Sequence, residues 1–76
     1  MRALIEFIAG KLVDHPEQIA VTQQEDEENL ILELRVAQED LGKVIGKQGR
    51  TARAMRAILA AAVNNEGKRP RLEIVE

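Results

Sequence analysis

The sequence predicts an α+β fold over residues 1–76, as a single domain with the element order α-β-β-α-α-β and three helices on one face of a small sheet. Apolar residues recur at helical spacing in three segments and alternate with other residues in three more. Helix-ending and turn-forming residues separate these segments. An apolar content of 45% excludes a compositionally disordered chain.

The first helix is expected in residues 2–13, which carry Leu4, Ile5, Ile8 and Leu12 on one face. It should end around Asp14, because Pro16 disfavours the helical conformation in the residue before it. Two strands follow, in residues 19–23 and 30–36. In the second strand alternate residues are apolar, namely Leu30, Leu32, Leu34 and Val36. The polar connection at residues 24–29 favours a hairpin.

The second half of the chain predicts two helices and a last strand. A short helix is expected in residues 38–45, with Glu39 and Asp40 in its first turn, where their charges suit the helix dipole. A longer helix is expected in residues 51–63, and residues 64–67 should end it. Its predicted core stripe consists of Ala54, Met55, Ile58, Leu59 and Ala62. Residues 71–75 alternate as a third strand.

The connection between these two helices contains Gly46 and Gly49. Glycine lets the backbone bend sharply and approach a ligand closely. The helix that follows offers N–H groups and a partial positive charge to an anion, and Lys47 and Arg50 add full charges. The glycine spacing excludes a P-loop and a dinucleotide-binding fingerprint. The alternative is that both glycines serve only the corner between two helices.

Charge is distributed unevenly along the chain. Residues 1–40 hold ten acidic and three basic residues, whereas residues 41–76 hold eight basic and three acidic residues. The resulting balances of −7 and +5 give the overall −2. This asymmetry indicates a side of the molecule that binds a polyanion.

The element order and the run Val44-Ile45-Gly46-Lys47-Gln48-Gly49 resemble a type II KH domain, and the likeness covers essentially the whole chain. Residues 39–54 are similar to the small stand-alone KH proteins of bacteria, the KhpA family. The resemblance implies the type II KH fold, whose three-stranded mixed sheet has its first two strands antiparallel and its last strand parallel to the central one. It also implies that residues 46–49 hold the backbone of about four nucleotides.

The resemblance further implies a groove for bases beside the loop, floored by Val44, Ile45 and the strand 30–36, and bordered by residues 65–69. We expect Lys47, Arg50 and Arg53 to converge on phosphates and Lys43 to widen this patch; Gln48 would contact phosphate or sugar. Alternatives remain open: Arg50 and Arg53 could pair with Glu39 or Asp40, and Arg56, Lys68 and Arg69 could be solvated. The double change Gly46→Asp and Lys47→Asp should weaken RNA binding and leave the fold intact.

The function that the resemblance implies is single-stranded RNA binding by an RNA chaperone that forms homodimers, or heterodimers with a larger KH-domain protein of the KhpB type. It also implies a role in cell elongation and wall synthesis. The alternatives are a protein-interaction module built on the helix 51–63, and single-stranded DNA binding. The chain has no cysteine and one histidine, so we expect no enzyme, cofactor or metal. Without a membrane-spanning run or a signal peptide, we expect a cytoplasmic protein.

Overall fold

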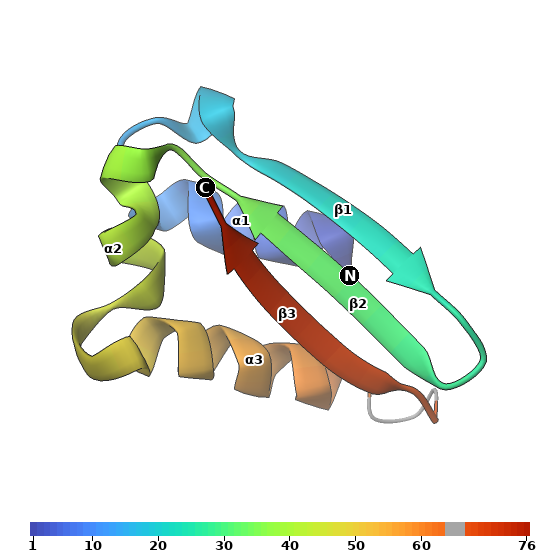
Figure 1. Ribbon diagram of the computed structural model, residues 1–76. Helices are drawn as coiled ribbons and strands as arrows, with labels where there is room; N and C mark the ends of the chain where they lie inside the picture. The colour runs from blue at the N-terminus through green and yellow to red at the C-terminus, as the bar shows by residue number, and fades with distance from the viewer. Residues whose placement is uncertain (64–66) are drawn as a thin grey trace.

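The computed structural model describes residues 1–63 and 67–76 and has the predicted α+β architecture, with the helices on one face of the sheet (Figure 1). Its main elements are α1 (Arg2–Leu12), β1 (Ala20–Glu25), β2 (Asn29–Arg35), α2 (Leu41–Ile45), α3 (Arg50–Ala62) and β3 (Arg69–Val75). Single 3-10 turns are η1 (Pro16–Gln18), η2 (Gln38–Asp40) and η3 (Lys47–Gly49). The predicted helix end at residues 64–66, part of the expected groove border, lies outside the described residues. None of the helices in the described part of the chain is long and apolar enough to span a membrane.

The sheet has the order β1-β2-β3, so β2 is central and β3 forms one edge. β1 runs antiparallel to β2, with Val21 opposite Leu34, and β3 runs parallel to β2, with Leu72 opposite Leu32. The hairpin between β1 and β2 is closed by Asp26, whose carboxylate accepts the N–H groups of Glu28 and Asn29 at 2.8 and 2.7 Å. The predicted mixed sheet is therefore confirmed.

The core lies between the helices and one face of the sheet. Leu30, Leu32 and Leu34 are at most 2% exposed, because alternate residues of β2 point to the same face. The helices cover them with Ile5, Ala9, Val44, Met55 and Leu59, and Val63, which follows α3, joins the same cluster. These residues form one continuous hydrophobic cluster, which gives a chain of this size its main source of stability.

The predicted orientation of two helices is wrong in part. In α3 the buried residues are Ala52, Met55 and Leu59, whereas Ala54, Ala62 and Ile58 of the predicted stripe are exposed. In α1 the fully buried residues are Ile5 and Ala9, and Leu12 is exposed. An alanine-rich helix carries apolar residues on every side, so periodicity alone does not identify its inner face.

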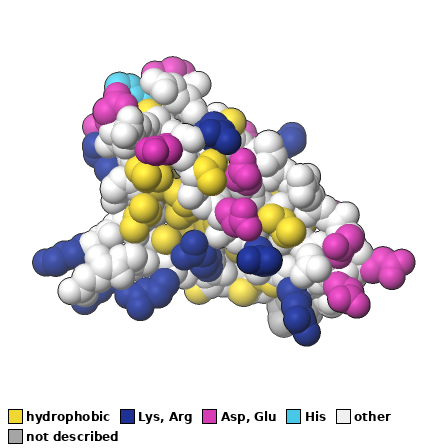
Figure 2. Space-filling model, in the orientation of Figure 1, with side chains coloured by type: hydrophobic (Ala, Val, Ile, Leu, Met, Phe, Trp, Pro, Cys, Tyr) yellow, Lys and Arg dark blue, Asp and Glu magenta, His cyan; other side chains and the backbone are white. Residues whose placement is uncertain are grey.

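Opposite charges gather at different places on the surface shown in Figure 2. Acidic side chains collect at the hairpin tip, where residues 25–28 are exposed, and basic side chains follow the glycine loop and α3. Other basic residues lie among acidic ones, and Lys68 is an example, since its ammonium contacts the carboxylate of Glu25. This contact lowers the pKa of Glu25, through the hydrogen bond and then through the charge of Lys68.

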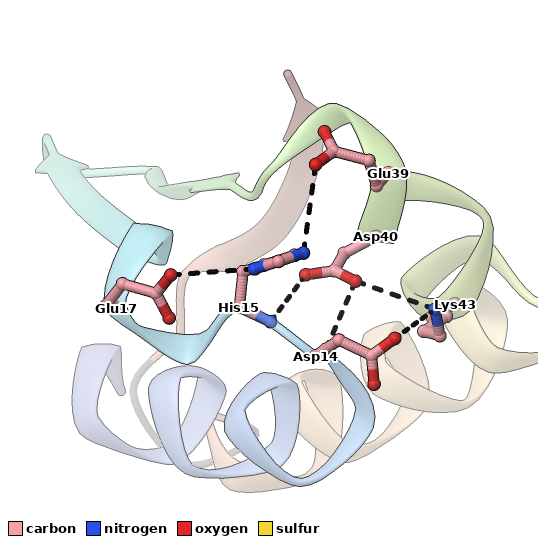
Figure 3. Close-up of polar contacts among 6 residues, drawn as sticks. All are labelled: Asp14, His15, Glu17, Glu39, Asp40 and Lys43. Atoms are coloured by element: carbon pink, nitrogen blue, oxygen red, sulfur yellow. Dashed lines mark hydrogen bonds and ion pairs between the residues drawn. The ribbon is translucent and has the colours of Figure 1, made fainter.

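Asp40 is the one buried charged side chain among the described residues, and it joins the start of α2 to the end of α1 (Figure 3). Its carboxylate accepts the backbone N–H groups of Asp14 and His15 at 3.1 and 2.9 Å. The Lys43 ammonium lies 3.7 Å from the same carboxylate. From the sequence we expect Asp40 in the first turn of a helix, where its charge suits the helix dipole. In the structure its main role is the contact with Asp14 and His15, far away in the sequence.

The surroundings of Asp40 hold its pKa below the ordinary value of 3.8. Burial by itself raises this pKa, because it penalises the charged form. The N–H groups of Asp14 and His15, followed by the charges of His15 and Lys43, outweigh that effect. The ionised carboxylate therefore stabilises the fold above pH 3.8, and this contribution is lost as the pH falls through the folded-state pKa.

Replacing Asp40 tests this linkage. Asn has the shape of the protonated acid, so Asp40→Asn should lower the melting temperature at neutral pH by roughly 5–10 °C through the loss of charge-assisted hydrogen bonds. The difference from the wild type should shrink as the pH falls below about 4. Thermal unfolding followed by circular dichroism measures both, with Glu39→Gln as an exposed control. A difference that stays constant down to strongly acidic pH would contradict this account.

Candidate nucleic-acid interface

The glycine loop begins at Gly46, which ends α2. Its N–H donates to the carbonyl of Gly42 at 2.8 Å, and its φ and ψ of 78° and 171° fall in a region open essentially to glycine alone. A Cβ at this position would lie 2.2 Å from Oγ1 of Thr51, in the first turn of α3. The backbone of α2 therefore packs directly against α3 at this point, and no other residue fits.

The second half of the loop also has a left-handed backbone. Gln48 and Gly49 have φ of 58° and 74°, and the N–H of Gly49 donates to the carbonyl of Gly46 at 3.1 Å. No atom outside its immediate neighbours lies within 4 Å of a Cβ built at Gly49, so only its backbone conformation favours glycine. Backbone geometry thus accounts for both glycines, and it leaves Lys47 and Gln48 exposed at the tip.

Two arginines of α3 converge on Gln48. Nη2 of Arg50 donates to the side-chain oxygen of Gln48 at 3.3 Å, and Nη2 of Arg53 donates to its backbone carbonyl at 3.1 Å. No ion pair with Glu39 or Asp40 involves either arginine within residues 1–63 and 67–76. The start of α3 carries no side-chain cap, so its first-turn N–H groups add to the positive field of the two guanidinium groups.

Lys43 does not join this basic group. Its ammonium lies 2.8 Å from Asp14, and Figure 3 shows it directed toward Asp14 and Asp40. The hydrogen bond to Asp14, the charge of that residue and then the charge of Asp40 raise the pKa of Lys43. The structure thus places Lys43 beside two carboxylates and not beside Gln48, and its expected contact with RNA stays a prediction.

A hollow of about 400 Å³ opens beside the loop, between α2, α3 and β3. It is lined by Ile45, Gln48, Gly49, Ala52, Arg53, Arg56 and Ile74. Figure 2 shows hydrophobic side chains in this region, with basic side chains along its lower border. An apolar floor next to cationic groups can accept a flat base while its phosphate lies against the positive charges.

The residues that floor this hollow differ from those expected. Ile45 lies in its wall and is 38% exposed, as the predicted groove requires, but Val44 is 0% exposed and belongs to the core. The leucines of β2 are also buried, because the helices cover the central strand. Ile74 of β3 takes their place, since β3 is the edge strand beside α3. The alternation of residues 71–75 carries no signal for this, because it does not show which other element lies beside each residue.

The two glycines should respond differently to the same substitution. Gly46→Ala introduces the contact with Thr51 and a forbidden conformation, whereas Gly49→Ala introduces only a left-handed alanine, which costs roughly 1–2 kcal/mol. We expect Gly46→Ala to lower the melting temperature clearly more than Gly49→Ala does. It follows that the double change of Gly46 and Lys47 to aspartate would disturb the fold, contrary to the expectation above. Equal melting temperatures for the two alanine variants would refute the packing of Gly46 on Thr51.

Comparison with known proteins identifies the family. A family model described as KhpA/KhpB, KH domain, matches residues 2–74. A protein named RNA-binding protein KhpA from Clostridium acetobutylicum is 51% identical over 75 residues, which cover 99% of this chain and all of that protein.

Proteins of the same name from Halalkalibacterium halodurans and Aquifex aeolicus are 47% and 49% identical over 76 residues. These alignments cover all of this chain, with 100% and 96% of the respective relatives. No solved structure matches the chain significantly. The family is not an enzymatic one, in agreement with the sequence. The resemblance seen in the glycine loop and the element order is therefore confirmed, and this chain belongs to the KhpA/KhpB family of KH domains.

Proposed function

We propose that this protein binds single-stranded RNA without catalysis, through the glycine loop and the hollow beside it. The observation that carries the proposal is the convergence of Arg50 and Arg53 on Gln48, at an uncapped helix start next to an apolar hollow. The names of the related KhpA proteins, which describe them as RNA-binding, support the same function.

Phosphates would bind at the loop, because Gly46 and Gly49 have no side chains and a ligand can approach the backbone closely there. Lys47, Arg50 and Arg53 would neutralise them and release counterions, so affinity should decrease as salt increases. One or more bases would lie in the hollow on Ile45 and Ile74. Bases would pack there on aliphatic side chains, because Phe7 is the only aromatic residue of the chain and belongs to α1.

A single KH domain holds about four nucleotides, so one copy should bind weakly. Pairing of two domains would raise the effective concentration of the second site. We therefore propose that the protein acts as a homodimer or together with a larger KH-domain protein of the KhpB type. A role as a cytoplasmic RNA chaperone in cell shape and wall synthesis is part of this proposal, and it rests on the family alone.

A charge reversal at the loop tip tests the RNA site. The double variant Lys47→Glu and Gln48→Glu changes two exposed side chains and should weaken binding to a short single-stranded RNA at least ten-fold. The slope of log affinity against log salt should fall by roughly 0.7 for each phosphate that the variant no longer neutralises. Fluorescence anisotropy across a salt series measures both effects, and single-stranded DNA of the same sequence tests discrimination by the 2′-OH.

A matched control is the double variant Lys11→Glu and Gln24→Glu, which makes the same charge change at exposed positions of α1 and β1. It should bind RNA nearly as well as the wild type does. Equal losses in the two double variants would mean that binding depends on overall charge and not on the loop.

The outer face of α3 favours self-association as a second function. Ile58 is 45% exposed, and the residues around it on this helix, Ala54, Ala57 and Ala61, are also exposed. Small side chains allow close approach of a second surface, and a chain of 76 residues gains stability by pairing. This function is compatible with RNA binding, because the loop lies at the end of the helix and not on this face.

Replacing Ile58 tests self-association. Ile58→Lys should leave the monomer folded, since the side chain is largely outside the core, and should shift the protein toward the monomer. Sedimentation velocity at high micromolar concentration compares it with the wild type, and Ala20→Lys on β1 is an exposed control. A wild type that sediments as a monomer would remove this second function.

A further inference from the structure

Arg56 makes the one contact between an arginine side chain of α3 and the backbone of the sheet among the described residues. Its Nε and Nη2 atoms donate to the carbonyl of Leu72 at 3.3 and 3.2 Å. These two atoms form one of the two forks of a guanidinium group, in which two N–H bonds point in the same direction. The second fork, formed by Nη1 and the other N–H of Nη2, makes no hydrogen bond to the described residues.

The carbonyl of Leu72 belongs to the outer edge of the sheet. The N–H of Arg69 and the carbonyl of Val75 bond to Glu28 and Val36, so alternate residues from Arg69 onward direct their polar backbone groups toward β2. Leu72 and Ile74 direct theirs away from β2, to the open edge of the sheet, because these groups alternate along a strand. Arg56 therefore occupies the central carbonyl of an edge that would otherwise be open to ligands.

Arg56 also lies between two hollows. It lines the one beside the glycine loop and a second one of about 420 Å³, which continues along β3. The second hollow is lined by Arg56, Leu59, Pro70, Arg71, Leu72 and Glu73. Its volume is within the range of small-ligand sites. The carboxylate of Glu73 makes it less suited to a phosphate than the loop is, whereas its apolar and hydrogen-bonding groups suit a nucleobase.

We propose that the second hollow, between α3 and β3, holds one nucleobase of the bound RNA. Arg56 makes this position selective for a base with two adjacent acceptors, guanine or cytosine. The proposal rests on the RNA binding proposed above. Because the Leu72 carbonyl is already occupied, the amino group of a base gains no acceptor there. The remaining fork of Arg56 presents two parallel donors instead.

The chemistry of the four bases explains the selectivity. Guanine carries O6 and N7 side by side, and arginine binds this pair with two hydrogen bonds. Cytosine carries O2 and N3 side by side. Adenine has an amino group next to N7 and next to N1, and the two carbonyls of uracil are separated by an N–H. Only guanine and cytosine therefore satisfy both donors of the fork.

The test uses short oligouridines in which one position at a time is replaced by guanine, cytosine or adenine. Affinities are measured by fluorescence anisotropy for the wild type, Arg56→Lys and Arg56→Gln. The wild type should prefer guanine or cytosine over adenine and uracil by roughly ten-fold at one position. The separate guanine and cytosine series show which of the two bases occupies the subsite.

Arg56→Lys keeps the charge and loses the fork. It should lose the base preference, while the slope of log affinity against log salt stays that of the wild type because the charge is unchanged. Arg56→Gln should lose the preference as well. Arg2→Lys is the control, an exposed exchange on α1 that should retain it, and thermal unfolding establishes that all variants are folded.

Three outcomes would overturn the proposal. The first is an unchanged preference in Arg56→Lys, and the second is a wild type that binds RNA with equal affinity for all four bases at every position. Both would leave the proposed RNA-binding function intact. The third is a wild type that binds none of the RNAs, which would remove the function and the subsite together.

Discussion

The position of the glycine loop depends on the buried carboxylate of Asp40. The helix that leads into the loop, α2, has only five residues, too few to be stable by its own hydrogen bonds. Asp40 holds its start to the end of α1 through the N–H groups of Asp14 and His15, and Val44 anchors its middle in the core. A buried anion is tolerated only when it is hydrogen-bonded. The end of α1 and the start of α2 therefore have one arrangement relative to each other and to the core. That arrangement places Gly46 against Thr51.

The parallel pairing of β3 with β2 determines which groups line the hollows beside α3. It puts β3 at the edge of the sheet and turns the backbone groups of Leu72 and Ile74 to that open edge, where the Leu72 carbonyl accepts from Arg56 of α3. The hollows along this edge combine an aliphatic floor with arginines from α3. The same helix thus supplies core residues on one face, phosphate-binding candidates at its start and Arg56 along the sheet edge.

The structural and the binding explanations of the glycine loop are not exclusive. Gly46 is required because α2 and α3 approach each other too closely for a Cβ, and this requirement holds without any ligand. The same corner leaves Lys47 and Gln48 exposed at the tip of the loop, and Arg50 and Arg53 contact Gln48 from α3. A loop built for packing therefore has the shape and charge that a phosphate backbone needs.

The sequence by itself determined the element order, the hairpin, the position of the loop and the family, because these follow from local periodicity, turn residues and a contiguous motif. It also indicated Arg50 and Arg53, which follow the loop directly in the chain. Only the tertiary structure decided which residues face the hollow, because the neighbours Val44 and Ile45 differ in exposure, 0% against 38%, and Ile74 arrives from the far end of the chain. The pairing of Lys43 with Asp14 and the contact of Arg56 with Leu72 likewise join segments far apart in sequence, and no local pattern records such distances.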